Sequence, residues 1–580
     1  MNGALLLLLG IACFVAAYFL YSRFIAKAIG VDPERPTPAH TMGDGIDYVP
    51  AHPMVLYGHH FAAIAGAGPI VGPVLAAEFG WVAVALWIVF GCIFIGSMHD
   101  MVTLFLSVRH EGKSIGSVIE DVLGRPGKMI FLMFCFSALV LVMAVFTGQV
   151  ADSFVSNPEV ATSSLLGIFE AALFGVCVYR LRWSVKWASL VFVPVLFLLV
   201  WLGVVFPCDL MQLFGVTAAT ARTIWVVVLF IYCFVASTLP VWLLLQPRDY
   251  LNSYLLYAML AIGLTAVLVV HPTIQIDAVA GFAVPKAGGG TKYLFPLLFV
   301  TVACGACSGF HALVASGTTS KQLDSERHIR PVGYGCMLLE GVVALLALLA
   351  VACGTQADLK EGLATLPPVK LFAQGLAGFC AKLGLPEKTS ESFMLLAVAA
   401  FLMTSVDACT RLARFVWQEL WSTSVASADE KVGEAKSTSA VVRLNRNMYF
   451  ATTVVVLIGV YLLVFNPSMS KNLWTMFASA NQMLASLTLL TASLWLFKKR
   501  LSWWIAFLPM CFMILTSGTA VFQLFLDNLG KWTKEGFAAG GVTAIGAAVL
   551  FCLAVTLLVL GAFKLRRILA NRVLQSIAKK

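Results

Sequence analysis

Long apolar blocks constrain the fold of this 580-residue chain more than any other feature. A helix needs about 20 apolar residues to cross the hydrocarbon core of a bilayer. Only 12% of the residues are charged, about half the usual share in a soluble domain, so the chain cannot cover a water-facing surface. Because a helix satisfies its own backbone hydrogen bonds in lipid, we expect an all-α polytopic membrane protein. The fifteen candidate spans are 3–27, 57–78, 81–108, 129–151, 161–179, 187–206, 223–245, 251–271, 293–315, 332–353, 393–415, 448–466, 473–497, 502–525 and 540–563.

The positive residues indicate how these spans are oriented. If the spans alternate in direction, 29 of the 39 Lys and Arg residues fall on the side that holds the C-terminus and 10 on the other. Cytoplasmic loops are enriched in Lys and Arg. We therefore expect a cytoplasmic (inner) membrane protein with its N-terminus outside and its C-terminus in the cytoplasm. The net charge of +10 follows from this asymmetry, and no basic stripe with interleaved aromatic residues predicts binding to nucleic acid.

One span is interrupted near its middle by residues that end and start helices. Glycine suits the left-handed end of one half-helix and proline the first turn of the next. A helix unwound at this point would offer free N–H groups and a positive dipole end to an anion such as a substrate carboxylate. Close helix packing by small residues is the alternative explanation. The interrupting residues are Gly66, Gly68, Pro69, Gly72 and Pro73, and the predicted substrate-binding residues are Ala65, Gly66, Ala67, Gly68 and Pro69.

A second interruption is predicted five spans later. Pro240 breaks an apolar run, and Ser237 and Thr238 offer small polar groups beside it, so we add both to the predicted substrate site. Two broken helices of opposite direction, five spans apart, are typical of a five-plus-five inverted repeat. This predicts an N-terminal helix and loop, repeat one, repeat two, and a loop followed by four C-terminal helices, at 1–56, 57–206, 207–420 and 421–580.

Ionisable side chains inside the spans are costly in lipid and are usually functional. Such groups could carry a coupling proton across the membrane if both sides reach them in turn. Static polar contacts between helices are the alternative for each of them. Sodium coupling also stays open, since unwound carbonyls and hydroxyls at Ala65, Thr301 and Ser308 could bind that ion. The proton-coupling candidates are His59, His60, His99, Asp100, Glu340 and Asp407, and His311 is a further intramembrane imidazole.

Several long motifs resemble the carbon starvation protein family of peptide and pyruvate transporters. They lie at 59–73, 78–81, 99–100, 240–249, 304–311 and 405–414, and the resemblance runs from about residue 1 to at least residue 500. It implies a cytoplasmic-membrane importer with a leucine-transporter-like fold, related to the amino acid–polyamine–organocation superfamily. It further implies uptake of peptides or pyruvate, a link to nutrient limitation, and proton symport for the pyruvate carriers. The best-known members are longer than 580 residues, chiefly toward the C-terminus.

These features together predict a secondary active transporter that imports small peptides or pyruvate and is driven by protons. A sodium-coupled symporter of amino acids or carboxylates is the alternative. A channel would need a continuous polar pore, and an enzyme would need a nucleophile or metal constellation. ATP is not expected as a fuel, because no GxxxxGK[ST] loop occurs. No cofactor or metal is expected, since no ligand pattern accompanies Cys304 and Cys307 in the sequence.

Overall fold

The computed structural model describes residues 1–43, 48–51, 53–240, 243–285, 291–421, 440–465 and 467–577. Within these ranges the chain is almost entirely helical. The sheet found there is a two-stranded antiparallel hairpin of β1 (Ala283–Pro285) and β2 (Thr291–Tyr293). The predicted all-α fold is confirmed.

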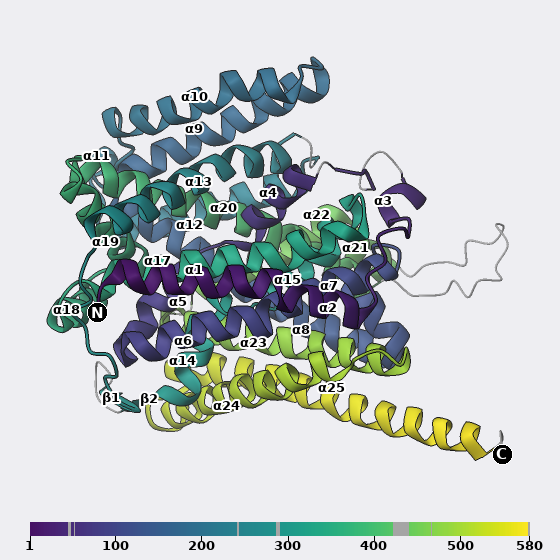
Figure 1. Ribbon diagram of the computed structural model, residues 1–580. Helices are drawn as coiled ribbons and strands as arrows, with labels where there is room; N and C mark the ends of the chain where they lie inside the picture. The colour runs from purple at the N-terminus through teal and green to yellow at the C-terminus, as the bar shows by residue number, and fades with distance from the viewer. Residues whose placement is uncertain are drawn as a thin grey trace.

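Most helices run roughly parallel or antiparallel to one another (Figure 1). The first group is α1 (Gly3–Phe19), α2 (Tyr21–Ile29), α3 (Pro38–Thr41), α4 (Pro53–Ile64), α5 (Gly68–Ala76), η1 (Ala77–Phe79), α6 (Trp81–Gly91), η2 (Cys92–Gly96), α7 (Ser97–Arg109), α8 (Ile115–Ser156), α9 (Pro158–Gly175), η3 (Val176–Arg180), α10 (Val185–Val205), α11 (Leu210–Phe214), α12 (Ala218–Thr238) and α13 (Leu245–Val270). The second group is α14 (Leu294–Val302), η4 (Ala303–Gly305), α15 (Phe310–Val314), η5 (Ala315–Thr319), α16 (Ser320–Gln322), η6 (Glu326–His328), η7 (Arg330–Gly335), α17 (Cys336–Ala352), α18 (Gln356–Thr365), α19 (Pro368–Lys382), α20 (Glu387–Leu420), α21 (Ala440–Arg446), α22 (Met448–Val464), α23 (Pro467–Lys498), α24 (Trp504–Glu535) and α25 (Phe537–Ile577).

Twelve helical segments are long and apolar enough to cross a membrane, and two bent pairs raise this number to fourteen among the described residues. Each of the fourteen overlaps one predicted span. The remaining predicted span, 293–315, corresponds to α14, η4 and α15, where the helix is interrupted. The prediction of about fifteen transmembrane helices therefore agrees with the structure, and the chain is a multi-span membrane protein.

The predicted break at Ala65–Gly68 is present. α4 ends at Ile64, α5 begins at Gly68, and the two half-helices meet at 42°. Pro69 lies in the first turn of α5, where a missing N–H costs nothing and a fixed φ favours the helix. Residues 60–74 are buried, so the break lies inside the bundle and away from its surface.

The second break is not where the sequence indicated. Pro240 lies after the end of α12, and α12 and α13 are each long enough to span the membrane alone. Pro240 thus follows a complete helix, which is an ordinary place for a residue that cannot continue one. The interruption lies between α14 and α15, where a short 3-10 turn and residues 306–309 separate the two half-helices.

The helices that follow each interrupted helix make similar contacts with one another. α5 packs against α14 and η4, and the long helices α8 and α20 pack against each other. α12 and α13 both contact α20, while α22 and α23 both contact α8. We propose that α4–α5, α6–α7, α8, α12 and α13 form one repeat and that α14–α16, α17, α20, α22 and α23 form its inverted counterpart. In this division the α9–α10 hairpin, which lies at one edge of the bundle, is an insertion, and α24 and α25 lie at the opposite edge (Figure 1).

Candidate functional site

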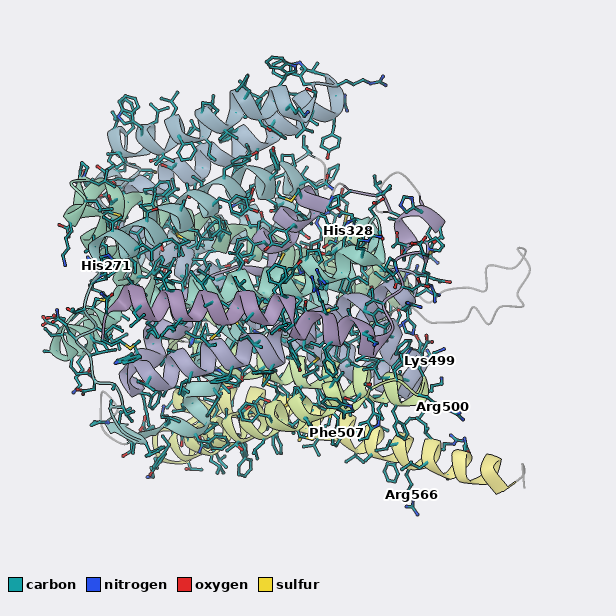
Figure 2. All side chains as sticks on the ribbon, in the orientation of Figure 1. His271, His328, Lys499, Arg500, Phe507 and Arg566 are labelled. Carbon is teal, nitrogen blue, oxygen red and sulfur yellow. The ribbon has the colours of Figure 1, made fainter. Side chains whose placement is uncertain are left out.

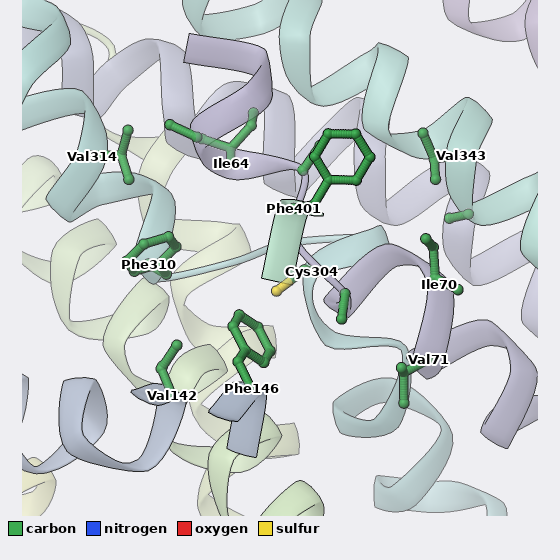
Figure 3. Packing of buried hydrophobic residues seen from close by; sticks show 14 of the residues in the cluster. Ile64, Ile70, Val71, Val142, Phe146, Cys304, Phe310, Val314, Val343 and Phe401 are labelled. Atoms are coloured by element: carbon green, nitrogen blue, oxygen red, sulfur yellow. The ribbon is translucent and has the colours of Figure 1, made fainter. Parts of the chain in front are cut away.

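A pocket lies at the break between α4 and α5. Its cavity volume is about 10 Å³, close to the room that one water molecule needs. Figure 3 shows several of its side chains, with Phe146, Phe310 and Cys304 arranged around the unwound segment. Its wall is therefore built from both interrupted helices together with α8, α20 and α23. The lining residues are Ile64, Gly66, Gly68, Val142, Phe146, Cys304, Phe310, Ser405 and Phe477.

The pocket has few polar groups, and three of them have no hydrogen-bond partner among the described residues. The N–H groups of Ala67 and Gly68 donate to no acceptor among the described residues, and Pro69 has no N–H. Ser405 Oγ is buried and also has no hydrogen-bond partner there. Because the positive end of the α5 dipole lies at the same place, this wall of the pocket suits a small anion.

The unwound segment tolerates no side chain at two of its glycines. A Cβ on Gly66 would lie 2.9 Å from Ser405 Oγ, and one on Gly68 would lie 2.5 Å from both Cβ and Sγ of Cys304. Both distances are shorter than real Cβ contacts. The two glycines thus let the backbone of the first break approach α20 and the second break closely.

A buried cluster of acids and imidazoles lies next to the second break. Asp100 Oδ2 is 2.7 Å from His311 Nδ1, and Asp100 Oδ1 is 2.8 Å from His99 Nδ1. On the other side of the ring, His311 Nε2 is 3.3 Å from Glu340 Oε2. All four side chains are fully buried. The structure therefore brings together three of the predicted coupling residues, His99, Asp100 and Glu340, around His311.

This cluster must hold protons. Two carboxylates beside neutral imidazoles would place two uncompensated negative charges inside the bundle, which is costly in a low-dielectric interior. Neither oxygen of Glu340 accepts a hydrogen bond from the described residues. His60 lies nearby in α4 and is held by Thr319, with Nδ1 at 2.8 Å from Oγ1.

Metal binding is a poorer explanation of these groups. Cys304, His311 and Glu340 offer ligand atoms within 4.8 Å of one another, a proximity that the sequence did not indicate. Cys304 Sγ is, however, already hydrogen-bonded to Ser308 and Asn481, and His311 bridges two carboxyl groups. We interpret the set as a hydrogen-bond and proton network.

Asp407 belongs to a separate cluster. Its Oδ2 accepts hydrogen bonds from Arg248 and from Tyr232, and Tyr232 also accepts one from Arg248. His59 faces the neighbouring Asp249, with Nδ1 and Oδ2 3.8 Å apart. The ion pair joins α13 to α20, which favours a static helix contact as the role of Asp407.

Asp407→Asn is expected to destabilise the protein, because it leaves Arg248 charged, buried and without its partner carboxylate. Breaking a buried pair in this way typically costs about 3–5 kcal/mol. Thermal unfolding in detergent, followed by size-exclusion chromatography, measures the loss. Asp152→Asn is the matched control: Asp152 pairs with Arg222 at 2.5 Å, but both side chains are about one-third exposed, so little stability should be lost. A stable Asp407→Asn protein with defective proton coupling would instead make Asp407 the coupling group.

Ser237 and Thr238 do not join the pocket. Thr238 Oγ1 donates to the carbonyls of Phe234 and Val235 in its own helix, and Ser237 is buried with an unpaired hydroxyl. Arg411 Nη2 caps the end of α12 through the carbonyls of Ala236 and Leu239. These two residues therefore lie at a helix end and not in the wall of the pocket at Ala65–Pro69, and their part in substrate binding stays a prediction.

The possible sodium ligands have different partners. Ser308 hydrogen-bonds Cys304 and Asn481, while the Thr301 carbonyl faces Gly72 in α5. No hydrogen bond among the described residues joins either of them to Ala65. The sequence missed Phe146, Cys304, Phe310, Ser405 and Phe477 as pocket residues, and only the glycines near 304–310 signalled that a second break lies there.

The family model described as "Carbon starvation protein CstA" matches residues 2–362 and 360–520. The chain belongs to the carbon starvation protein CstA family. This confirms the resemblance expected from the motifs at 59–73 and 304–311. It also agrees with the site, since both motifs contribute residues to the pocket at the two breaks.

Curated members of the family cover most of the chain. A protein named peptide transporter CstA from Escherichia coli (strain K12) is 34% identical over 93% of this chain and 83% of its own length. A protein named pyruvate/proton symporter BtsT from the same strain is 30% identical over 89% of this chain and 81% of its own length. A solved structure of MhsT in complex with L-phenylalanine aligns at a TM-score of 0.46 and 11% identity, covering 87% of this chain and 99% of that one.

Proposed function

We propose that this chain is a secondary active transporter that imports a small carboxylate across the cytoplasmic membrane with protons. One observation carries the proposal: a pocket with free N–H groups at the start of α5 lies beside a buried acid–imidazole cluster. The first feature suits a carboxylate and the second suits a proton. Family members bearing the names of a peptide transporter and a pyruvate/proton symporter agree with both parts. The chain is not proposed to catalyse a chemical reaction.

The pocket favours the smaller of these two substrate classes. None of its lining side chains is a carboxylate, and Cys304 is the one residue among them that ionises at all. A peptide would bring an ammonium group that finds no counter-charge there, and an unpaired buried charge is costly. Pyruvate needs only the carboxylate site, a hydroxyl such as Ser405 for its keto group, and apolar surface for its methyl group. We therefore infer a pyruvate-sized monocarboxylate as the preferred substrate.

The position of His311 links substrate binding to proton movement in this proposal. Phe310 lines the pocket, and the next residue, His311, contacts Asp100 and Glu340. A substrate that displaces the first turn of α15 must move the imidazole relative to both acids. Asp100, His311 and Glu340 are thus the proposed coupling groups, with His60 and His99 beside them. Sodium coupling is less well supported, because the hydroxyl of Ser308 is committed to Cys304 and Asn481.

The proposed orientation places the C-terminus in the cytoplasm. Lys499, Arg500 and Arg566 lie toward the end of the bundle that holds the C-terminus, and His271 lies at the opposite end (Figure 2). This placement of positive residues agrees with the excess of Lys and Arg counted on the side that holds the C-terminus, and it supports the proposed orientation. The pocket would then open to the outside through movement of α5 and to the cytoplasm through movement of α4.

Substrate protection of Cys304 tests the pocket. Cys304 is in the pocket wall, so saturating pyruvate should slow its alkylation by a small maleimide at least about tenfold, while dialanine protects it less. Mass spectrometry of the peptide that contains Cys304 gives the rate, in a Cys307→Ser background that removes the neighbouring thiol. Cys208, which is partly exposed in the connection between α10 and α11, is the internal control and should react equally with or without substrate. Equal rates at Cys304 in both conditions would contradict the assignment of this pocket.

A further inference from the structure

Asn481 on α23 holds the second break through its side chain. Its Oδ1 accepts a hydrogen bond from the Phe310 N–H at 2.8 Å, and its Nδ2 donates to Ser308 Oγ at 3.0 Å and Cys304 Sγ at 3.3 Å. Its relative exposure is 1%. Gly309, the residue before α15, has no side chain that could cap the helix. Asn481 therefore supplies, from 171 positions away, the acceptor that a Ser or Asp would normally provide locally.

The main chain of α23 adds a further contact at the same point. The Gly309 N–H donates to the Asn481 carbonyl at 3.1 Å. A Cβ on Gly309 would lie 2.3 Å from that carbonyl oxygen and 2.5 Å from the Ala485 nitrogen. Such a close approach of two backbones is possible only at a glycine. The unwound residues are thus held against α23 by both its backbone and its side chain.

The other half of the interrupted helix is fastened by the adjacent residue. Gln482 Nε2 donates to the Phe299 carbonyl at 2.5 Å, in the last turn of α14. Carbonyls of a final helical turn have no partner within the helix and need one elsewhere. Asn481 and Gln482, neighbours in the sequence, hence pair with an N–H group of one half-helix and, together with Trp87, with a carbonyl of the other.

The turn that Asn481 holds joins the pocket to the proton cluster. Cys304 and Phe310 belong to the pocket wall, and His311 follows Phe310 directly. The hydrogen bond to the Phe310 N–H fixes the backbone from which both neighbouring side chains project. A shift of this turn therefore changes the shape of the pocket and the distances from His311 to Asp100 and Glu340 at the same time.

We propose that Asn481 is a positioning residue that couples occupancy of the pocket to the His311 cluster. This inference rests on the proposed function, because it assigns the mechanical link between substrate and proton. A simple contact between helices would stabilise the bundle and would leave substrate affinity and proton dependence unchanged. A positioning role predicts changes in both.

Asn481→Ala is the first variant, because it removes both the acceptor for Phe310 and the donor to Cys304 and Ser308. We expect backbone hydrogen exchange in residues 303–312 to rise at least about tenfold and KM for pyruvate to rise about tenfold. The number of protons moved per substrate should fall, flattening the pH profile of uptake. Asn481→Asp keeps the acceptor for Phe310 and should restore most of the protection from exchange.

Thr488→Val is the matched control on the same helix. Thr488 is fully buried, and within the described part of the chain its hydroxyl bonds only the Leu484 carbonyl one turn earlier, so its loss should alter none of the three readouts. Exchange at 303–312 needs no substrate, so it still tests Asn481 if the wild-type protein transports no pyruvate and the proposed function fails. Unchanged exchange in Asn481→Ala would overturn the inference. Raised exchange with wild-type KM and pH profile would also overturn it, by showing a structural role alone.

Discussion

Gly68→Leu is expected to reduce uptake at least about a hundredfold, because the new side chain would occupy the pocket and displace its wall. A Cβ alone at this position lies 2.5 Å from Cys304 Cβ and Sγ, so even the first atom of the side chain forces the two breaks apart. The free N–H groups at the start of α5 would then no longer face a closed pocket. Initial rates of labelled pyruvate uptake into proteoliposomes measure the effect, with the amount of inserted protein determined in the same vesicles.

Gly378→Leu is the matched control for this substitution. Gly378 lies in α19, and a Cβ there would meet no atom within 4 Å, so the same change in residue type should leave uptake close to wild type. Normal uptake by Gly68→Leu would remove the first break from the transport path. Loss of uptake by both variants would point to a general effect of the substitution on the folded protein.

Glu340→Gln is expected to abolish accumulation driven by a proton gradient while substrate exchange continues. The amide has the shape of the carboxyl group but cannot bind or release a proton, and it leaves the His311 imidazole with one acid partner, Asp100. Under an inward gradient of one pH unit, the accumulation ratio should fall from about tenfold, for one proton per substrate, to about one. Preloaded vesicles that swap labelled for unlabelled pyruvate report exchange.

Glu170→Gln is a close control for that experiment. Glu170 in α9 is also a buried carboxyl group, and neither of its oxygens has a hydrogen-bond partner among the described residues. It lines neither the pocket nor the His311 cluster, so its neutralisation should preserve both accumulation and exchange. If Glu340→Gln accumulates pyruvate as the wild type does, the coupling proton is held elsewhere.

The first break was predictable because its cause is local. Gly66, Gly68 and Pro69 change the backbone preferences at their own positions, whatever surrounds them. The second break has no proline, and its free backbone groups are satisfied by Asn481 and Gln482 from a distant helix. A sequence pattern shows which residues could unwind. It does not show which distant side chains would form hydrogen bonds with the backbone groups that unwinding leaves free in lipid. Pro240 drew the prediction to the wrong place, since a proline marks a helix end as readily as a break.

The buried polar residues show the same limit. His99, Asp100 and Glu340 were recognisable as costly groups in spans, and the structure places them together around His311. Asp407 satisfied the same criterion, yet it lies in an ion pair with Arg248. Hydropathy identifies ionisable residues inside the spans, but tertiary packing decides which side chain each of them contacts. The three-dimensional structure is therefore needed to separate the His311 cluster from the Asp407–Arg248 ion pair.

Uptake of labelled pyruvate into proteoliposomes in sodium-free buffer, with and without an inward proton gradient, tests the proposed function most directly. A gradient of one pH unit should drive about tenfold accumulation for one proton per substrate, and its dissipation should release the label. No accumulation by folded protein, or accumulation only after sodium is added, would contradict a proton-coupled transporter of pyruvate-sized carboxylates.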